Sequence, residues 1–288
     1  MSRIRLSTPL PPKLTEWLNG VYPAWLQLPE ESFHALVPFN APQSPLRLDY
    51  PENAADLAAS SIFSNLRLFL TLIGEGRVAL LPDGTMTSDS LDLLLETTDW
   101  PNYDIDLTRN LERPLDQESI GPLDFLIALA IEGRLIRIEE GRIKVTDDGR
   151  RLRENVIDAS IVQAVFEAAF ARVNPRTLTK LAHPWVQEQA GIIFWGLSIT
   201  ADKPRAVSEL TRYCFVPPEK FLSQWFKVLD VYMRAVYLTP MTWFGLMRTT
   251  SPQGDKTDVH ERFYLKAPIF EQFMHFEIER AHPAERPN

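Results

Sequence analysis

The sequence is poor in cysteine and short of positive charge. Cys214 is the one cysteine in 288 residues, which excludes an internal disulfide and any zinc site built from several cysteines. This usage is typical of a protein made in a reducing compartment. Lys and Arg number 30 against 38 Asp and Glu, for a formal net charge of -8. Duplex DNA would repel that average charge unless the basic residues gathered on one face.

Long apolar runs are missing as well. The longest candidate, residues 191–199, is far too short to span a bilayer. We expect no signal peptide, because Pro9, Pro11 and Pro12 interrupt the region where its apolar core would lie. The sequence therefore predicts a cytoplasmic protein without membrane contacts. Hydrophobic residues still make up 45% of the chain, including seven Trp and 16 Phe, which is typical of a globular protein with a buried core.

The sequence contains no recognisable catalytic motif. A Gly-x-Ser-x-Gly nucleophile elbow is absent, and Cys214 has no neighbouring histidine. Gly74-Glu75-Gly76 lacks the remaining residues of a phosphate-binding loop, so it predicts a helix end. The carboxylates of the acidic stretch have no spacing that pairs them for acid–base work, and a solvated loop explains them: Asp99, Asp104, Asp106 and Asp116.

One histidine cluster near the C-terminus is a candidate metal site. On a helix, His275 and Glu279 would share a face, but His282 is seven residues beyond His275. A zinc site needs ligands at closer helical spacing or a further donated ligand. A solvated C-terminal helix explains these residues better. We therefore expect no enzyme, no cofactor, no metal site and no small-molecule substrate.

The predicted fold is mainly α with small β-hairpins (α+β), built as tandem winged-helix-like modules joined by a helical spacer. Residues 1–57 are rich in proline and aromatic residues, which predicts an ordered arm across the body of the protein. A first module covers residues 58–155, the spacer covers 156–202, and a second module covers 203–288. The spacer is expected to hold helices over 157–173, 178–182 and 187–199, because apolar residues recur there at helical spacing.

The first module has the clearer pattern. Helical spacing over 63–73 is followed by a predicted strand at 78–81 and a helix capped by Thr87 or Ser88. Pro122 can open a further helix, which ends at Gly133. Strands at 135–138 and 143–146 flank the turn Glu140-Gly141, and a new helix starts at Arg150. Helix, tight hairpin and helix in this order form the end of a winged-helix unit.

The second module repeats this order with weaker turn signals. Helices are predicted over 207–215 and from Pro217 through Met233, the latter ending before Pro240. Strands at 241–247 and 262–265 are joined by a polar turn, and a helix over 268–276 closes the unit.

Two stretches carry short motifs of a known family. The first, residues 65–152, contains Val-Ala-Leu-Leu-Pro-Asp-Gly at 78–84 and Val-Thr-Asp-Asp-Gly-Arg-Arg-Leu at 145–152. The second, residues 170–246, contains Trp-Phe-Gly-Leu at 243–246. Both resemble the helical winged-helix portion of the pRiA-type plasmid ORF family, uncharacterised bacterial proteins. Thr85-Met86 departs from the Asn-Leu usual in that family. The resemblance implies a winged-helix fold in a bacterial protein and brings no activity.

Two groups of basic residues are candidate DNA contacts. The helix before the hairpin, 123–132, has no Lys or Arg and only two polar residues, both acidic. A reading helix exposes polar and basic side chains, so we expect this helix to be buried. Cations cluster in the hairpin and beyond it, where phosphate contact and a charged strand edge are the alternatives: Arg134, Arg137, Arg142, Lys144, Arg150, Arg151 and Arg153. Lys220, Lys227 and Arg234 fall seven apart on one predicted helix face.

These observations favour a non-enzymatic interaction protein that acts as a subunit of a protein assembly or as a homo-oligomer. Trp17, Trp25 and Trp185 are candidate interface anchors, with ordinary core packing as the alternative for each. A second hypothesis is a DNA-associated regulator or mobile-element protein that contacts duplex DNA. Its candidate contacts are Arg137, Arg142, Lys144, Arg150, Lys220, Lys227 and Arg234.

Overall fold

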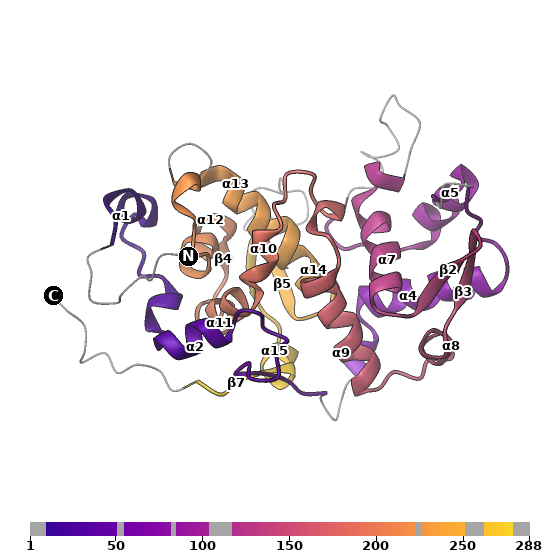
Figure 1. Cartoon of the computed structure of the whole chain (residues 1–288), viewed down its shortest axis with the longest axis horizontal. Coiled ribbons are helices and arrows are strands. Elements are labelled where there is room, and N and C mark those ends of the chain that lie inside the picture. Colours follow the sequence, from indigo (N-terminus) through magenta and orange to yellow (C-terminus); the bar gives the residue numbers. More distant parts are fainter. Residues whose placement is uncertain are drawn as a thin grey trace. The chain divides into compact units, whose positions relative to one another are not determined.

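The computed structural model describes residues 10–50, 55–81, 85–103, 117–222, 226–250 and 262–278 (Figure 1). Helices predominate, and the described strands form small antiparallel sheets of two or three strands. The predicted fold class, mainly α with small hairpins, is confirmed. None of the described helices is both long enough and apolar enough to cross a bilayer.

The chain divides into two compact units, each built from separate stretches of sequence. Unit 1 consists of Met1–Leu48, Trp185–Leu238 and Met247–Asn288, and unit 2 consists of Asp49–Pro184 and Thr239–Leu246. The predicted arm, residues 1–57, is divided between the units after Leu48, and the predicted spacer is divided between them after Pro184.

Unit 2 is a helical body with one β-hairpin (Figure 1). Its helices and strands in chain order are α3 (Ala55–Ala58), α4 (Ser61–Gly74), α5 (Ser88–Thr97), the 3-10 turn Gln117–Ser119, α7 (Gly121–Glu132), β2 (Ile136–Glu139), β3 (Arg142–Val145), α8 (Asp147–Arg153), α9 (Ala159–Glu167), the π-wound turn Ala168–Arg172, the 3-10 turn Pro175–Thr177, and α14 (Thr239–Trp243). Thr87 caps α5 by accepting a hydrogen bond from the Ser90 N–H. The predicted strand at 78–81 is wrong, because only a single bridge, Leu80 to Met86, forms there.

The predicted buried helix, α7, forms as expected. Pro122 lies in its first turn, where its missing N–H leaves no intrahelical bond unmade. Leu123, Phe125, Leu126 and Leu129 are fully buried, and α7 contacts α4, α5 and α9. It is therefore a central core element of unit 2.

Residues 239–246 complete that core from far along the chain. Trp243 and Phe244 are buried, and the Trp243 Nε1–H donates to the Pro101 carbonyl at 3.1 Å. The predicted strand at 241–247 is wrong: α14 runs through Trp243, Gly245 turns the backbone at φ 74°, and β5 (Met247–Thr250) starts only at Met247. Pro240 does not end the helix, since it is the second residue of α14.

Unit 1 gathers the arm, a central helical block and the C-terminal strands. Its elements are α1 (Pro12–Leu18), the 3-10 turn Ala24–Gln27, α2 (Glu30–Ala35), β1 (Leu46–Leu48), α10 (Trp185–Glu188), α11 (Ala190–Thr200), β4 (Arg205–Ala206), α12 (Val207–Cys214), the 3-10 turn Glu219–Phe221, α13 (Phe226–Tyr232), the π-wound turn Met233–Leu238, β5, β6 (Phe263–Lys266), α15 (Ile269–Phe273) and β7 (Met274–Phe276). Strand β1 pairs antiparallel with β7, and the other sheet has the order β4-β6-β5.

The arm packs tightly onto α11. A Cβ at Gly191 would lie 2.3 Å from the Leu36 carbonyl oxygen, so only glycine permits this approach of the arm. Trp25 is buried, and its Nε1–H donates to the Phe215 carbonyl at 2.8 Å. Arg47 on β1 pairs with Glu277 at 3.2 Å. The arm is therefore held by apolar packing and by strand pairing.

Three of the helices predicted from the sequence are wrong in extent. Residues 178–182 form turns, and the helix expected from Pro217 to Met233 is divided into the turn Glu219–Phe221, α13 and the π-wound turn from Met233. The helix expected over 268–276 ends at Phe273, where the chain continues as β7. β7 places His275 on a strand paired with β1, which removes the helical spacing assumed for His275 and Glu279. Glu279 and His282 lie outside the described residues.

Candidate interaction surface

The β2–β3 hairpin of unit 2 divides its side chains cleanly between two faces. The Glu140-Gly141 turn has φ values of 51° and 71°, as a two-residue type I′ turn requires. The register pairs Ile136 with Val145 and Ile138 with Ile143. Because side chains alternate along a strand, one face is entirely β-branched and apolar. The other face is entirely charged and contains Arg137, Glu139, Arg142 and Lys144.

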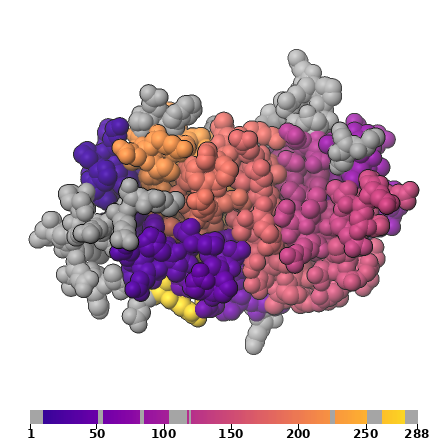
Figure 2. Space-filling view, viewed as in Figure 1, coloured from indigo at the N-terminus to yellow at the C-terminus, as the bar shows by residue number. Residues whose placement is uncertain are grey.

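The apolar face runs from the core out to the surface. Ile136, at the base, is 3% exposed, whereas Ile138 is 42% exposed. Ile138 and its cross-strand neighbour Ile143 thus lie at the end of the hairpin next to the turn. Figure 2 shows in pink the part of the chain that contains the hairpin, which contributes to the molecular surface. The Ile138–Ile143 pair is therefore accessible to solvent, and the charged side chains of β2 and β3 lie on the opposite face.

On the opposite face, one carboxylate pairs with two of the three cations. Glu139 accepts from Lys144 Nζ at 2.5 Å and pairs with Arg137 Nε at 2.9 Å. The hydrogen bond from Lys144 is the main reason that the pKa of the Glu139 carboxyl lies below its ordinary value. The Glu139 carboxylate therefore pairs with two of the candidate phosphate contacts, Arg137 and Lys144.

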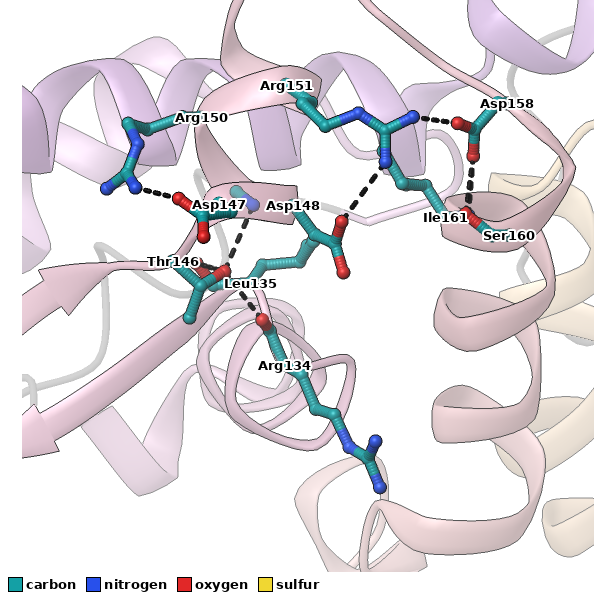
Figure 3. A network of polar contacts seen from close by, with 11 residues as sticks. Arg134, Leu135, Thr146, Asp147, Asp148, Arg150, Arg151, Asp158, Ser160 and Ile161 are labelled. Atoms are coloured by element: carbon teal, nitrogen blue, oxygen red, sulfur yellow. Dashed lines mark hydrogen bonds and ion pairs between the residues drawn. The ribbon is translucent and has the colours of Figure 1, made fainter.

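The turn from the hairpin into α8 is fixed by a threonine cap (Figure 3). Thr146 Oγ1 accepts from the Gly149 N–H at 3.1 Å and lies 2.7 Å from the Arg134 carbonyl, to which its hydroxyl donates. A Cβ at Gly149 would meet the Leu135 carbonyl oxygen at 2.1 Å. Glycine and a capping hydroxyl at these positions hold α8 close against the start of β2.

Acidic groups also hold the cations of α8 (Figure 3). Arg150 pairs with Asp147, and Arg151 bridges Asp148, at 3.2 Å, to Asp158. Asp158 caps α9 by accepting from the Ile161 N–H at 3.1 Å and the Ser160 hydroxyl at 2.7 Å. The Ser160 hydrogen bond is the largest of the effects that lower the pKa of Asp158. This network connects α8 to α9.

These ion pairs reduce the number of cations that are available to contact phosphates. Residues 134–158 contain seven Arg and Lys but also six Asp and Glu. Four of the candidate DNA contacts lie in this segment. Arg137, Lys144 and Arg150 are ion-paired, and Arg142 is the fourth. Within the described residues, Arg134, Arg142 and Arg153 have no carboxylate within 4.0 Å. Most of the cluster would have to exchange an internal partner for a phosphate.

The second set of basic candidates does not share a helix face. Lys220 lies in the 3-10 turn, with its Nζ 5.2 Å from the Phe221 ring centre. Lys227 lies in α13, and Arg234 lies in the π-wound turn. A seven-residue spacing aligns side chains only on one continuous α-helix, so the predicted stripe loses its geometric basis.

The three tryptophans differ in burial. Trp25 is a core residue of unit 1, so the alternative of core packing applies to it. Trp17 is half-buried, and its carbonyl accepts from Arg212 Nε at 3.0 Å. Trp185 is also half-buried, with its ring 5.2 Å from that of Phe221 and 6.1 Å from that of Tyr232. Trp17 and Trp185 keep a partly accessible ring.

The chemistry available elsewhere is limited. Burial raises the pKa of the Cys214 thiol to about 12, which keeps it protonated and a poor nucleophile. Among the described residues, no three His, Cys, Asp or Glu side chains are grouped as metal ligands.

Sequence reasoning missed the accessible pair formed by Ile138, which is exposed, and Ile143, which is half-buried. The alternation that predicted the hairpin contained a signal for it, because the β-branched positions continue up to the turn, beyond the reach of the core.

Comparison with known proteins gives one match. Residues 58–158 match the family model described as the Y4jL N-terminal domain, an uncharacterised family. The matched segment, about a third of the chain, runs from the end of α3 to the cap of α9 within unit 2. No curated protein and no solved structure matches the chain. The match includes the first of the two stretches that resemble the pRiA-type family, and the winged-helix assignment stays a prediction.

Proposed function

We propose that this chain is a non-enzymatic interaction protein that acts as a subunit of a protein assembly and contacts its partner through the end of the β2–β3 hairpin. The observation that carries the proposal is the Ile138–Ile143 pair at the end of the hairpin, in which Ile138 is 42% exposed and Ile143 is half-buried. In this proposal, α7, the hairpin and α8 form a winged-helix unit used for protein contact.

The burial of α7 supports protein rather than DNA as the partner. In a DNA-reading winged helix, the helix before the hairpin offers polar side chains to the major groove. Here most of its large side chains are buried in unit 2, with Leu123, Phe125, Leu126 and Leu129 fully so, and Ile131 near its end is 37% exposed. Exposed apolar side chains rimmed by charges are, by contrast, typical of protein interfaces.

Affinity capture with the full chain tests this proposal. We expect partner proteins recovered with the wild type to be lost with I138D, since a carboxylate in the middle of an apolar contact would have to be desolvated. V156D is the matched control, because Val156 is 46% exposed, against 42% for Ile138, in the same unit. Identical protein profiles for wild type and I138D, measured by quantitative mass spectrometry, would contradict the proposal.

A DNA-associated role is the second candidate, favoured by one observation: Arg142 and Arg153 have no carboxylate partner among the described residues. It predicts salt-dependent binding to duplex DNA that weakens in the R142E/K144E variant. Fluorescence anisotropy at low ionic strength distinguishes the two roles. We expect no binding; tight binding that this variant abolishes would favour the DNA role.

A further inference from the structure

Within the described part of the chain, no strand pairs with the outer edge of β2, and the hydrogen-bonding groups of that edge follow from the register. The Thr146 N–H donates to the Leu135 carbonyl at 3.0 Å, which makes this opposed pair a hydrogen-bonded one. Such pairs alternate along an antiparallel ladder, so Arg137 and Glu139 bond to β3. The N–H and C=O groups of Ile136 and Ile138 then point away from β3. Among the described residues, no backbone group bonds to Ile138 on that side.

We propose that this edge binds a second copy of the chain, with β2 pairing antiparallel to β2 around a two-fold axis at Ile138. This inference rests on the proposed function and names the partner as the protein itself. A two-fold axis gives a closed contact in which both copies use the same surface.

Charge complementarity fixes the register. With Ile138 opposite Ile138 of the second copy, each Arg137 lies opposite a Glu139, and each Glu139 lies opposite an Arg137. These are the non-hydrogen-bonded positions of the new ladder, where opposed side chains are closest. The two Ile138 residues exchange N–H to C=O bonds in this arrangement. One four-residue strand is therefore self-complementary in charge and in hydrogen bonding.

The other edge of the hairpin does not offer this match. If β3 paired with β3 around Ile143, Arg142 would lie opposite Lys144, and like charges directly opposite are destabilising. Pairing β2 with β3 of a second copy would place Arg137 opposite Lys144 and would leave an open edge at each end. The β2 edge is favoured because only its charges alternate in sign.

The apolar face explains why pairing would be favourable. In the proposed four-stranded sheet, Ile143 and Ile138 of one copy and Ile138 and Ile143 of the other form one row. Ile138 is 42% exposed in the single chain, and contact with Ile138 of the second copy would remove part of that exposed area from water. The contact is small, so we expect weak association that strengthens with concentration.

Sedimentation equilibrium over a concentration series tests the pairing. We expect reversible dimers of the wild type and at least roughly tenfold weaker association of R137E, because two attractive pairs become repulsive. R137E should keep its hairpin, since residue 137 lies directly opposite Lys144. Residue 139 lies directly opposite Arg142, so E139R is combined with R142E to keep an attractive pair within the hairpin. The variant R137E/E139R/R142E exchanges the two charges on β2 and should dimerise like the wild type.

Mixing two variants of opposite charge gives the sharpest result. R137E chains have two acidic side chains on β2, and E139R/R142E chains have two basic ones, so each should associate weakly alone and the mixture should form heterodimers. Thermal unfolding by circular dichroism checks that each variant is folded. A wild type that is monomeric at every concentration, or a mixture that does not associate while the wild type does, would overturn the proposed pairing.

The two proposals can fail separately. A monomeric wild type that still loses its captured partners on I138D contradicts only the self-pairing. A wild-type dimer that persists in R137E, with capture unaffected by I138D, places the protein contact elsewhere and contradicts both.

Discussion

Units 1 and 2 differ in how far apart in the sequence their parts lie. Unit 2 is almost one continuous stretch, Asp49–Pro184, with eight residues added from Thr239–Leu246. Unit 1 is assembled from three stretches separated by more than a hundred residues at the widest gap. The family match lies entirely in the continuous part. Local sequence is therefore sufficient to specify most of unit 2, whereas unit 1 depends on contacts that no local pattern reveals.

The eight added residues are the exception within unit 2. The Phe244 ring lies 5.4 Å from that of Phe166 and 6.0 Å from that of Phe63, while Trp243 lies 4.7 Å from Trp100. These rings come from the continuous stretch and would be partly exposed without residues 239–246. Most of unit 2 thus comes from one continuous stretch, but its aromatic core is completed by residues that are distant in the sequence.

Removing the Trp243 side chain takes a buried ring out of this aromatic core and has the largest expected effect on stability. Because the ring is 2% exposed and surrounded by aromatic side chains, W243A should lower the free energy of unfolding by about 3–5 kcal/mol. Urea unfolding followed by circular dichroism measures the change. W243F keeps an aromatic ring but loses the bond to Pro101, so its loss should be clearly smaller. A loss under about 1 kcal/mol for W243A would show that residues 239–246 are dispensable for the core.

The corresponding test in unit 1 is at the crossing of α11 and α12. A Cβ at Gly196 would lie 2.8 Å from the Cys214 Sγ and 3.0 Å from its Cβ. G196A should therefore destabilise by about 1–3 kcal/mol through overpacking. Adding C214A removes the closer atom and should recover part of the loss, which a double-mutant cycle in urea detects. Strictly additive effects of the two changes would contradict this contact.

How much could be predicted from sequence follows the same division. The hairpin, the threonine cap of α5 and the buried α7 are specified by turn residues, capping residues and apolar spacing within short windows, and the structure has all three. The errors occur where tertiary packing overrides a local signal. Residues 241–247 read as a strand because they are apolar and aromatic, but they form a helix end and turn among the rings of unit 2.

The candidate surface was predictable only in part. The clustering of cations around the hairpin was visible in the sequence, but their pairing was not, since Arg151 and Asp158 are seven residues apart and belong to different helices. The charge ladder on β2 and β3 required the register of the strands. Arg142 opposite Glu139, and Lys144 opposite Arg137, follow once the two-residue turn is known.

The local specification of unit 2 can be tested at one capping hydroxyl. Thr146 caps α8 and also bonds to the carbonyls of Arg134 and Leu135. T146A should lower the free energy of unfolding by about 1 kcal/mol. T146S keeps the hydroxyl and should stay close to the wild type in the same urea experiment. Equal losses for both variants would assign the effect to the threonine methyl group.

The smallest expected effect is a pH dependence from the link between α8 and α9. The pKa of Asp158 is lowered in the folded protein, so its stabilising contribution is present above the ordinary carboxyl pKa of 3.8 and is lost as pH falls through the folded value. D158N keeps an acceptor for the α9 cap but loses the charge that faces Arg151. The stability difference between wild type and D158N should therefore be constant near neutral pH and shrink below pH 3.8. It should also shrink in high salt, because the two side chains are 41% and 40% exposed and the pair is screened. A difference that persists unchanged in acid and in salt would mean that Asp158 acts through its cap alone, and that α8 and α9 are held together by their apolar contacts.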